Sequence, residues 1–102
     1  MRLTQSFVRV AAEFVRAPDI DHWGYRLVRN ANQTSAVVYP MLAKMVALHW
    51  VSEFREDPAT ITESRPPRRY YRLTELGRDE LVGKLRAAQA DPRFASVGLE
   101  WL

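Results

Sequence analysis

The chain has 102 residues, a length that favours one domain with one modest hydrophobic core. Hydrophobic residues make up 47% and charged residues 26%, with 15 Lys and Arg against 12 Asp and Glu, which is typical of a globular protein with a mild basic excess. The absence of cysteine excludes disulfides, thiolate nucleophiles and cysteine-based metal sites, and it fits a cytoplasmic protein. No apolar run approaches a membrane span, and charges interrupt the only candidate signal peptide, so we expect no membrane partner.

The first half of the chain predicts three helices. Apolar residues recur at helical spacing over residues 3–16, and Pro18 then stops the pattern. Asp21 is expected to cap a second, short helix that ends near residues 30–32, where two asparagines favour a turn. A third helix follows, capped by Thr34 or Ser35. Two short helices joined by a turn of this length predict a helix-turn-helix.

The second half predicts a β-hairpin and a final helix. Residues 51–55 and 70–73 alternate and contain aromatics, which is typical of strands, and the polar segment 56–68 between them holds three prolines. Thr74 is expected to cap a helix over residues 75–90, which Asp91 and Pro92 end. This order predicts a mainly α fold with a small hairpin, a winged helix-turn-helix, in residues 1–90. Residues 91–102 form an apolar tail.

The third helix is the candidate for reading DNA, because a major groove about 12 Å wide admits one α-helix. Its N-terminal backbone N–H groups also point positive partial charge towards a phosphate. The side chains that it would offer to the duplex lie at its start and along its first half: Gln33, Thr34, Ser35, Val37, Tyr39 and Lys44.

A cluster of arginines marks the end of the hairpin loop. Arg65, Arg68, Arg69 and Arg72 fall within eight residues that contain no acidic group, and prolines 66 and 67 hold the segment extended. Beside a helix-turn-helix, this cluster indicates contact with nucleic acid, whereas elsewhere it would indicate a solvated turn. Strand alternation places Arg68 and Arg69 on opposite faces and leaves Arg72 free to pair with the body of the domain.

Several of these segments together resemble PadR-type transcriptional regulators over about residues 5–88. The resemblance is carried by three boxes. The first is His22-Trp23-Gly24-Tyr25, the second is Val38-Tyr39-Pro40-Met41-Leu42, and the third is Pro66-Pro67-Arg68-Arg69-Tyr70-Tyr71-Arg72-Leu73-Thr74, followed by Gly77. MarR-like and ArsR-like regulators are related alternatives, but the third box favours PadR. The resemblance implies a dimeric winged-helix repressor that binds DNA.

The resemblance also implies roles for individual residues. Tyr39 and Pro40 would mark the recognition helix, Arg65 and Arg68 would be the wing contacts, and Tyr25 matches the tyrosine of the first box. This chain departs from the family by carrying Trp23 inside that box. It also has Ala36-Val37 where the family has Gly-Thr, so that a methyl group replaces a hydroxyl, and His49 where the family often has glycine.

The family's first and last helices commonly form the dimer. By resemblance, the residues that would fill this role are Leu3, Phe7, Phe14, Leu81, Leu85 and Ala88. Trp101 lies in the apolar tail with Phe94, Val97 and Leu99, which is more apolar surface than a small domain easily covers. A dimer contact, a groove for a small aromatic ligand, and packing of the tail on the chain's own first helix all remain open.

The remaining polar residues indicate neither catalysis nor a cofactor. His22 and His49 are the only histidines, and they are interpreted as a surface residue and a helix-end residue rather than metal ligands. The acidic pairs at residues 56–57 and 79–80 are interpreted as solvated faces, because no nucleophile accompanies them. We therefore expect no enzyme activity, no metal and no cofactor.

The sequence thus predicts a sequence-specific repressor that acts as a homodimer on a palindromic operator. The alternative is a winged helix used for protein–protein contact, in which the apolar tail binds the partner and the arginines are incidental. Retention of genomic DNA fragments at low salt would separate the two hypotheses.

Overall fold

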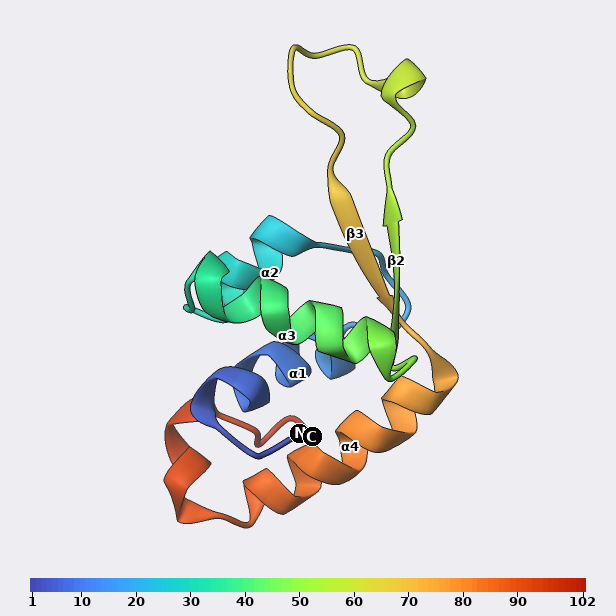
Figure 1. Ribbon diagram of the computed structural model, residues 1–102. Coiled ribbons are helices and arrows are strands. Elements are labelled where there is room, and N and C mark those ends of the chain that lie inside the picture. The colour runs from blue at the N-terminus through green and yellow to red at the C-terminus, as the bar shows by residue number, and fades with distance from the viewer.

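A computed structural model describes residues 1–102 and shows four packed α-helices from which a long hairpin projects, so that the molecule measures 46 × 25 × 23 Å (Figure 1). The hairpin with its loop, residues 51–73, is called the wing below. The helices and strands are α1 (Gln5–Arg16), β1 (His22–Trp23), α2 (Gly24–Asn30), α3 (Ser35–Ala47), β2 (Val51–Arg55), η1 (Pro58–Thr60), β3 (Arg69–Leu73), α4 (Glu75–Gln89) and η2 (Pro92–Val97). The predicted winged helix-turn-helix is confirmed.

Threonine side chains start two of the helices. Thr4 Oγ1 accepts a hydrogen bond from Phe7 N at 3.1 Å, and Thr74 Oγ1 accepts one from Gly77 N at 2.9 Å. Each bond satisfies a backbone donor that has no partner inside the helix. Thr34 also precedes α3, as predicted, but its side chain makes no capping bond.

The two helices of the helix-turn-helix end in the same way. Asn32 N donates to Arg29 O and Gln33 N to Val28 O at the end of α2. The same pair of bonds closes α3 around His49 and Trp50. Both arrangements are Schellman motifs, which require one residue in the left-handed region. Asn32 has φ of 54° and His49 has φ of 59°, so neither turn uses glycine.

The sheet has three strands rather than the two predicted, in the order β1-β3-β2. β1 pairs His22 with Tyr71 and Trp23 with Tyr70, so the chain is still extended where Asp21 was expected to cap a helix. Asp21 instead accepts a hydrogen bond from Arg72, and Trp23 stands at the N-cap of α2. The two-residue strand was missed because it is too short to show alternation.

The interpretation of His22 as a surface residue was wrong. Its ring is buried and meets the Phe14 ring edge-on at a centroid distance of 4.9 Å. Its Nε2 donates to Ala17 O at 2.8 Å, which satisfies one buried polar atom. His22 therefore closes the core beneath the sheet.

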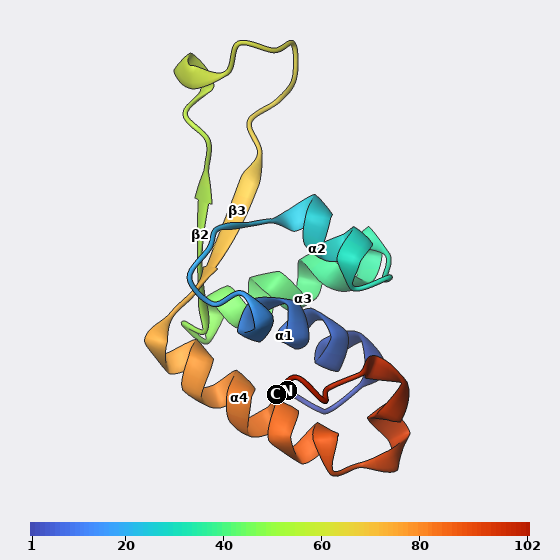
Figure 2. The same ribbon diagram turned by 180° about the vertical axis from the view of Figure 1, so that it is seen from behind.

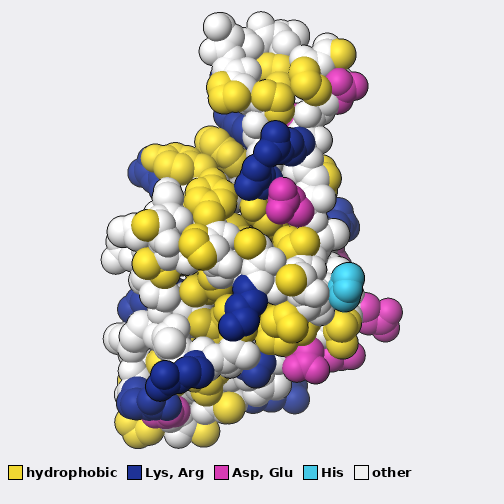
Figure 3. Space-filling model, viewed as in Figure 1, with side chains coloured by type: hydrophobic (Ala, Val, Ile, Leu, Met, Phe, Trp, Pro, Cys, Tyr) yellow, Lys and Arg dark blue, Asp and Glu magenta, His cyan; other side chains and the backbone are white.

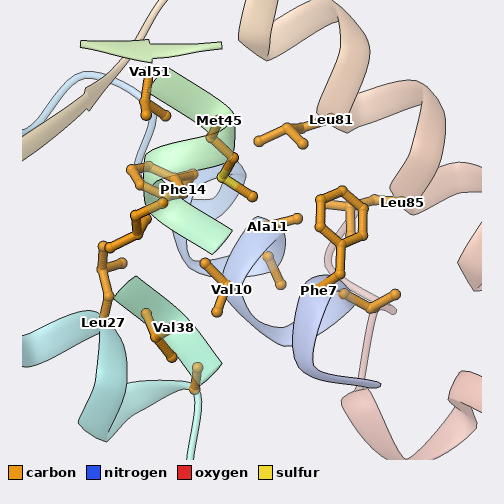
Figure 4. Close-up of a cluster of buried hydrophobic side chains, with 14 of the residues drawn as sticks. Phe7, Val10, Ala11, Phe14, Leu27, Val38, Met45, Val51, Leu81 and Leu85 are labelled. Atoms are coloured by element: carbon orange, nitrogen blue, oxygen red, sulfur yellow. The ribbon is translucent and has the colours of Figure 1, made fainter. Parts of the chain in front are cut away.

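The core lies between α1, α3, α4 and the inner face of the sheet (Figure 4). Phe7 and Phe14 of α1 lie two turns apart and project into it, towards Leu85 and Leu27 respectively. Val51 and Tyr71 close it from the sheet. Burial of side chains of this size stabilises a fold by about 1.5–3 kcal/mol each.

The C-terminal tail packs back on the chain's own first helix. Phe94 and Leu99 belong to the core, Gln5 Nε2 donates to Arg93 O at 2.7 Å, and the Arg16 guanidinium lies 4.9 Å from the centre of the Trp101 ring. The two termini lie side by side (Figure 2). Of the three possibilities for the tail, the structure adopts the intramolecular one.

This packing corrects the expected dimer face. Most of the residues assigned to it are at most 1% exposed because the chain's own core covers them: Phe7, Phe14, Leu81, Leu85 and Ala88. Leu3 is half-buried against the core, and Trp101 is 38% exposed. A contact between two copies has only the latter two of these residues available to it.

Gly77 has a structural reason to be glycine. A Cβ at this position would lie 1.8 Å from Trp50 O, a distance that no side chain tolerates. That carbonyl accepts hydrogen bonds from Thr74 N at 3.0 Å and Thr74 Oγ1 at 3.1 Å. The glycine that follows the third box therefore allows α4 to start against the end of α3.

His49→Gly is expected to stabilise the fold by roughly 0.5–1 kcal/mol. A side chain in the left-handed region costs about 1–2 kcal/mol, and the greater unfolded-state freedom of glycine offsets about 0.4–1 kcal/mol of that gain. Urea unfolding at an unchanged slope measures the difference. His49→Ala is the matched control, because it removes the imidazole and keeps Cβ. Equal gains from both variants would contradict the assignment of the strain to backbone conformation.

Candidate nucleic-acid interface

One face of the molecule carries the first half of α3 and the base of the wing. Figure 3 shows basic side chains on the helices and at the base of the hairpin, with hydrophobic side chains between them. Thr34, Ser35, Pro40 and Lys44 are exposed, and Val37 is 42% exposed, whereas the next residue is fully buried. α3 thus offers a mixed apolar and hydroxyl-bearing surface to the solvent.

Two of the residues expected to contact DNA have side chains that make contacts within the protein instead. Gln33 Oε1 accepts a hydrogen bond from Ser6 Oγ at 2.6 Å, so this side chain ties the turn to α1 rather than projecting from it. Tyr39 is half-buried, and its ring lies so close to Gly24 that a Cβ there would be 3.0 Å from Cε1. The glycine of the first box therefore makes room for the Tyr39 ring.

Three of the wing arginines are paired with carboxylates. Arg65 donates to both oxygens of Glu56, at 2.7 and 3.1 Å. Arg69 Nε lies 3.2 Å from Glu53 Oε1. As strand alternation allowed, Arg72 pairs with the body of the domain, donating to Asp21 at 3.2 Å and to the Asp19 carbonyl at 2.8 Å. Much of the positive charge seen in the sequence is thus compensated locally.

Glu56 closes the wing loop. Besides its two bonds to Arg65, its Oε1 accepts a hydrogen bond from Arg68 N at 2.9 Å, and Glu56 N donates to Arg68 O at 3.0 Å. The bonds from Arg65 and from Arg68 N hold the pKa of the Glu56 carboxyl at about 2, below its ordinary value. The interpretation of this residue as part of a solvated acidic face was wrong.

A groove of about 600 Å³ lies at the base of the wing, between the hairpin and α3. We call it the wing-base groove. Its walls are two aromatic rings, two prolines and four arginines: Trp23, Tyr39, Pro66, Pro67, Arg55, Arg65, Arg68 and Arg69. Tyr39 belongs to α3, so the groove joins the exposed face of that helix to the wing.

Arg68 stacks on Trp23 at the rim of this groove. The guanidinium carbon lies 4.0 Å from the centre of the indole ring, which is within range of a cation–π interaction. Pairing of Trp23 with Tyr70 in the sheet places Arg68 one diagonal step from Trp23 on the same face. Tyr25 lies beyond Trp23, with ring centres 5.4 Å apart, and is 45% exposed.

Sequence analysis missed three residues of this site. Trp23 was noted only as a departure from the family's first box, Arg55 lies outside the arginine cluster, and Glu53 was not connected with Arg69. One signal was available: pairing Val51 with Leu73 fixes a register in which Glu53, Arg55 and Arg69 share one face. That register shows which arginines face carboxylates.

None of the helices is long and apolar enough to cross a membrane. The model of the transcriptional regulator PadR-like family matches residues 21–82, which covers the helix-turn-helix, the wing and the start of α4. A search among curated proteins gives no significant match.

Solved structures share the fold at low sequence identity. A PadR family transcription regulator from Clostridium difficile R20291 superposes with a TM-score of 0.62 and 19% identity, covering 81% of this chain and 88% of that one. A PadR-like transcription factor from Bacteroides fragilis gives 0.60 and 18%, covering 90% and 88%. The circadian clock associated protein Pex from Anabaena gives 0.62 and 14%, covering 85% and 78%.

The Glu56 carboxyl is expected to titrate in the folded protein with a midpoint near pH 2, because its pKa is lowered to about 2 from 4.5. A lowered carboxyl pKa stabilises the folded wing above the ordinary value, and this contribution is lost as pH falls from about 4.5 through 2. Carboxyl ¹³C shifts measure the midpoint, and the protection factor of the Arg68 amide against hydrogen exchange should fall over the same range. Glu56→Gln is the control that abolishes the step. A midpoint near 4.5 would contradict the closed loop.

Proposed function

Because the chain belongs to the PadR-like family of transcriptional regulators, we propose that it is a repressor that binds double-stranded DNA in a sequence-specific manner. α3 enters the major groove, and the base of the wing grips the adjoining phosphate backbone. The observation that carries this proposal is the continuity between the exposed half of α3 and the arginine-lined wing-base groove, which share Tyr39. One duplex can therefore meet both surfaces.

Base recognition is assigned to the exposed start of α3. Ser35 offers a hydroxyl that donates to or accepts from a base edge, and the Val37 methyl groups fit a thymine methyl. Lys44, about two turns after Val37, supplies a charge for a phosphate. Gln33 is not part of this set, because Ser6 already holds its side chain.

The protein acts as a homodimer on a palindromic operator in this proposal. A single recognition helix reads only a few base pairs, and two-fold symmetry doubles the site. The tail covers α1, so the contact between copies is made by groups that stay outside the core, including Trp101 and Leu3. Occupied operators would block the promoter.

Genomic fragments incubated with the protein at low salt should yield a retained set with a shared inverted repeat. Footprinting should show two protected half-sites whose centres lie about 34–36 Å apart, one turn of DNA. Affinity for these fragments should exceed that for random DNA by at least about 10³-fold. Failure to retain any fragment would contradict DNA binding, and a single protected half-site would contradict the dimer alone.

Val37→Thr is expected to change operator preference more than bulk affinity, because it exchanges a methyl group for a hydroxyl without changing the shape. Loss of one base contact typically costs about 1–3 kcal/mol at that base pair. Competition between operator variants and random duplexes measures the effect, and Ser35→Ala should act in the same way. Ser96→Ala, an exposed serine in η2, is the matched control. Equal losses on operator and random DNA would refute the assignment.

A further inference from the structure

The arginines around the wing divide into two groups. Arg65, Arg69 and Arg72 each lie within 3.2 Å of a carboxylate oxygen of Glu56, Glu53 or Asp21, in that order. Arg55 and Arg68 have no acidic partner. The two arginines without a counter-charge both line the wing-base groove.

Arg55 stands in an arrangement that is unfavourable in the free protein. It lies directly opposite Arg69 in the β2–β3 ladder, and like charges at such a position repel each other. Glu53 compensates Arg69 and leaves Arg55 uncompensated. An anion in the groove would relieve this repulsion, so the repulsion itself indicates where a negative group binds.

Arg68 is held in place at both of its ends. Its backbone N–H donates to Glu56, and its guanidinium carbon lies over the Trp23 ring, 4.0 Å from the ring centre. Stacking occupies the face of a guanidinium and leaves the N–H groups along its edge free for a phosphate. Arg65, in contrast, already donates two of its N–H groups to the carboxylate of Glu56.

We propose that the wing-base groove is a phosphodiester site for the bound duplex, in which Arg55 and Arg68 are the direct ligands and Trp23 is the positioning residue that presents Arg68. Arg65 and Arg69 shape the groove through their carboxylate partners and do not contact the DNA. This inference rests on the proposed function, and it reverses the wing role that the family resemblance assigns to Arg65. Trp23 is the residue by which this chain departs from the family's first box, and in this proposal it orients Arg68 towards the phosphate.

The first test is the salt dependence of binding to a random duplex. Each phosphate contact releases counterions, so Arg55→Gln and Arg68→Gln should each lower the slope of log K against log salt concentration by about 0.9. Arg86→Gln removes an exposed charge on α4 and should leave the slope unchanged. The double variant Glu53→Gln/Arg69→Gln removes an ion pair without changing the net charge and should also leave the slope unchanged, because Arg69 makes no phosphate contact in this proposal.

The second test separates positioning from stability. Trp23→Leu should lower affinity about as much as Arg68→Gln, and combining the two should add little, because the indole acts through Arg68. Trp23→Phe keeps an aromatic face and should recover most of the affinity. Melting temperatures establish that the compared variants are folded. If Trp23→Leu does not fold, Trp23→Phe and Arg68→Lys carry the test, since lysine keeps the charge but loses the planar fork.

The outcomes distinguish this inference from the proposed function. If the wild-type protein binds no DNA, the proposed function fails and the phosphodiester site fails with it. If the wild type binds and the slopes of Arg55→Gln and Arg68→Gln match it, only the site assignment is overturned. An equal slope change in Arg86→Gln would show that net charge alone matters and would also overturn it. Additive losses for Trp23→Leu and Arg68→Gln would remove Trp23 from the positioning role.

Discussion

The arrangement of the whole domain depends on one junction, where Thr74 binds the end of α3. Thr74 N and Oγ1 donate to the Trp50 carbonyl, and Oγ1 also lies 2.6 Å from His49 O. In a few residues this junction ends α3, starts β2, ends β3 and caps α4. Because the wing leaves the body here, the same bonds fix the angle between the hairpin and α3. A duplex can meet both surfaces only if that angle is held.

Local charge pairing decides which of the wing's cations remain available to a ligand. A count of arginines in the sequence treats them alike. An arginine with a carboxylate within about 4 Å is already neutralised, however, and is less available to a phosphate. Glu53 and Glu56 act in this way while also ordering the strands that carry them. Arg65 and Arg69 therefore help to order the wing through their carboxylate partners, whereas Arg55 and Arg68 keep an uncompensated positive charge.

The sequence predicts the fold well and the site only in outline. Helical spacing, the threonine at residue 74 and the alternation in residues 51–55 and 70–73 are local signals, and each is confirmed. β1, the burial of His22 and the pairing of Glu56 depend on segments far apart in the chain, which no local pattern records. The dimer face was assigned by resemblance, and most of its residues are buried in this chain's own core. The expected DNA face combines a helix that local spacing predicts with a groove that forms only when distant segments pack together.

The central claim is that α3 and the wing-base groove contact the same duplex at the same time. An NMR titration of the isotopically labelled protein with a captured operator fragment tests it most directly. We expect the amide of Val37, the indole N–H of Trp23 and the side-chain Nε–H of Arg55 to shift together, with one dissociation constant. Shifts confined to α4 and the tail, or shifts of α3 without those of the groove, would contradict the account.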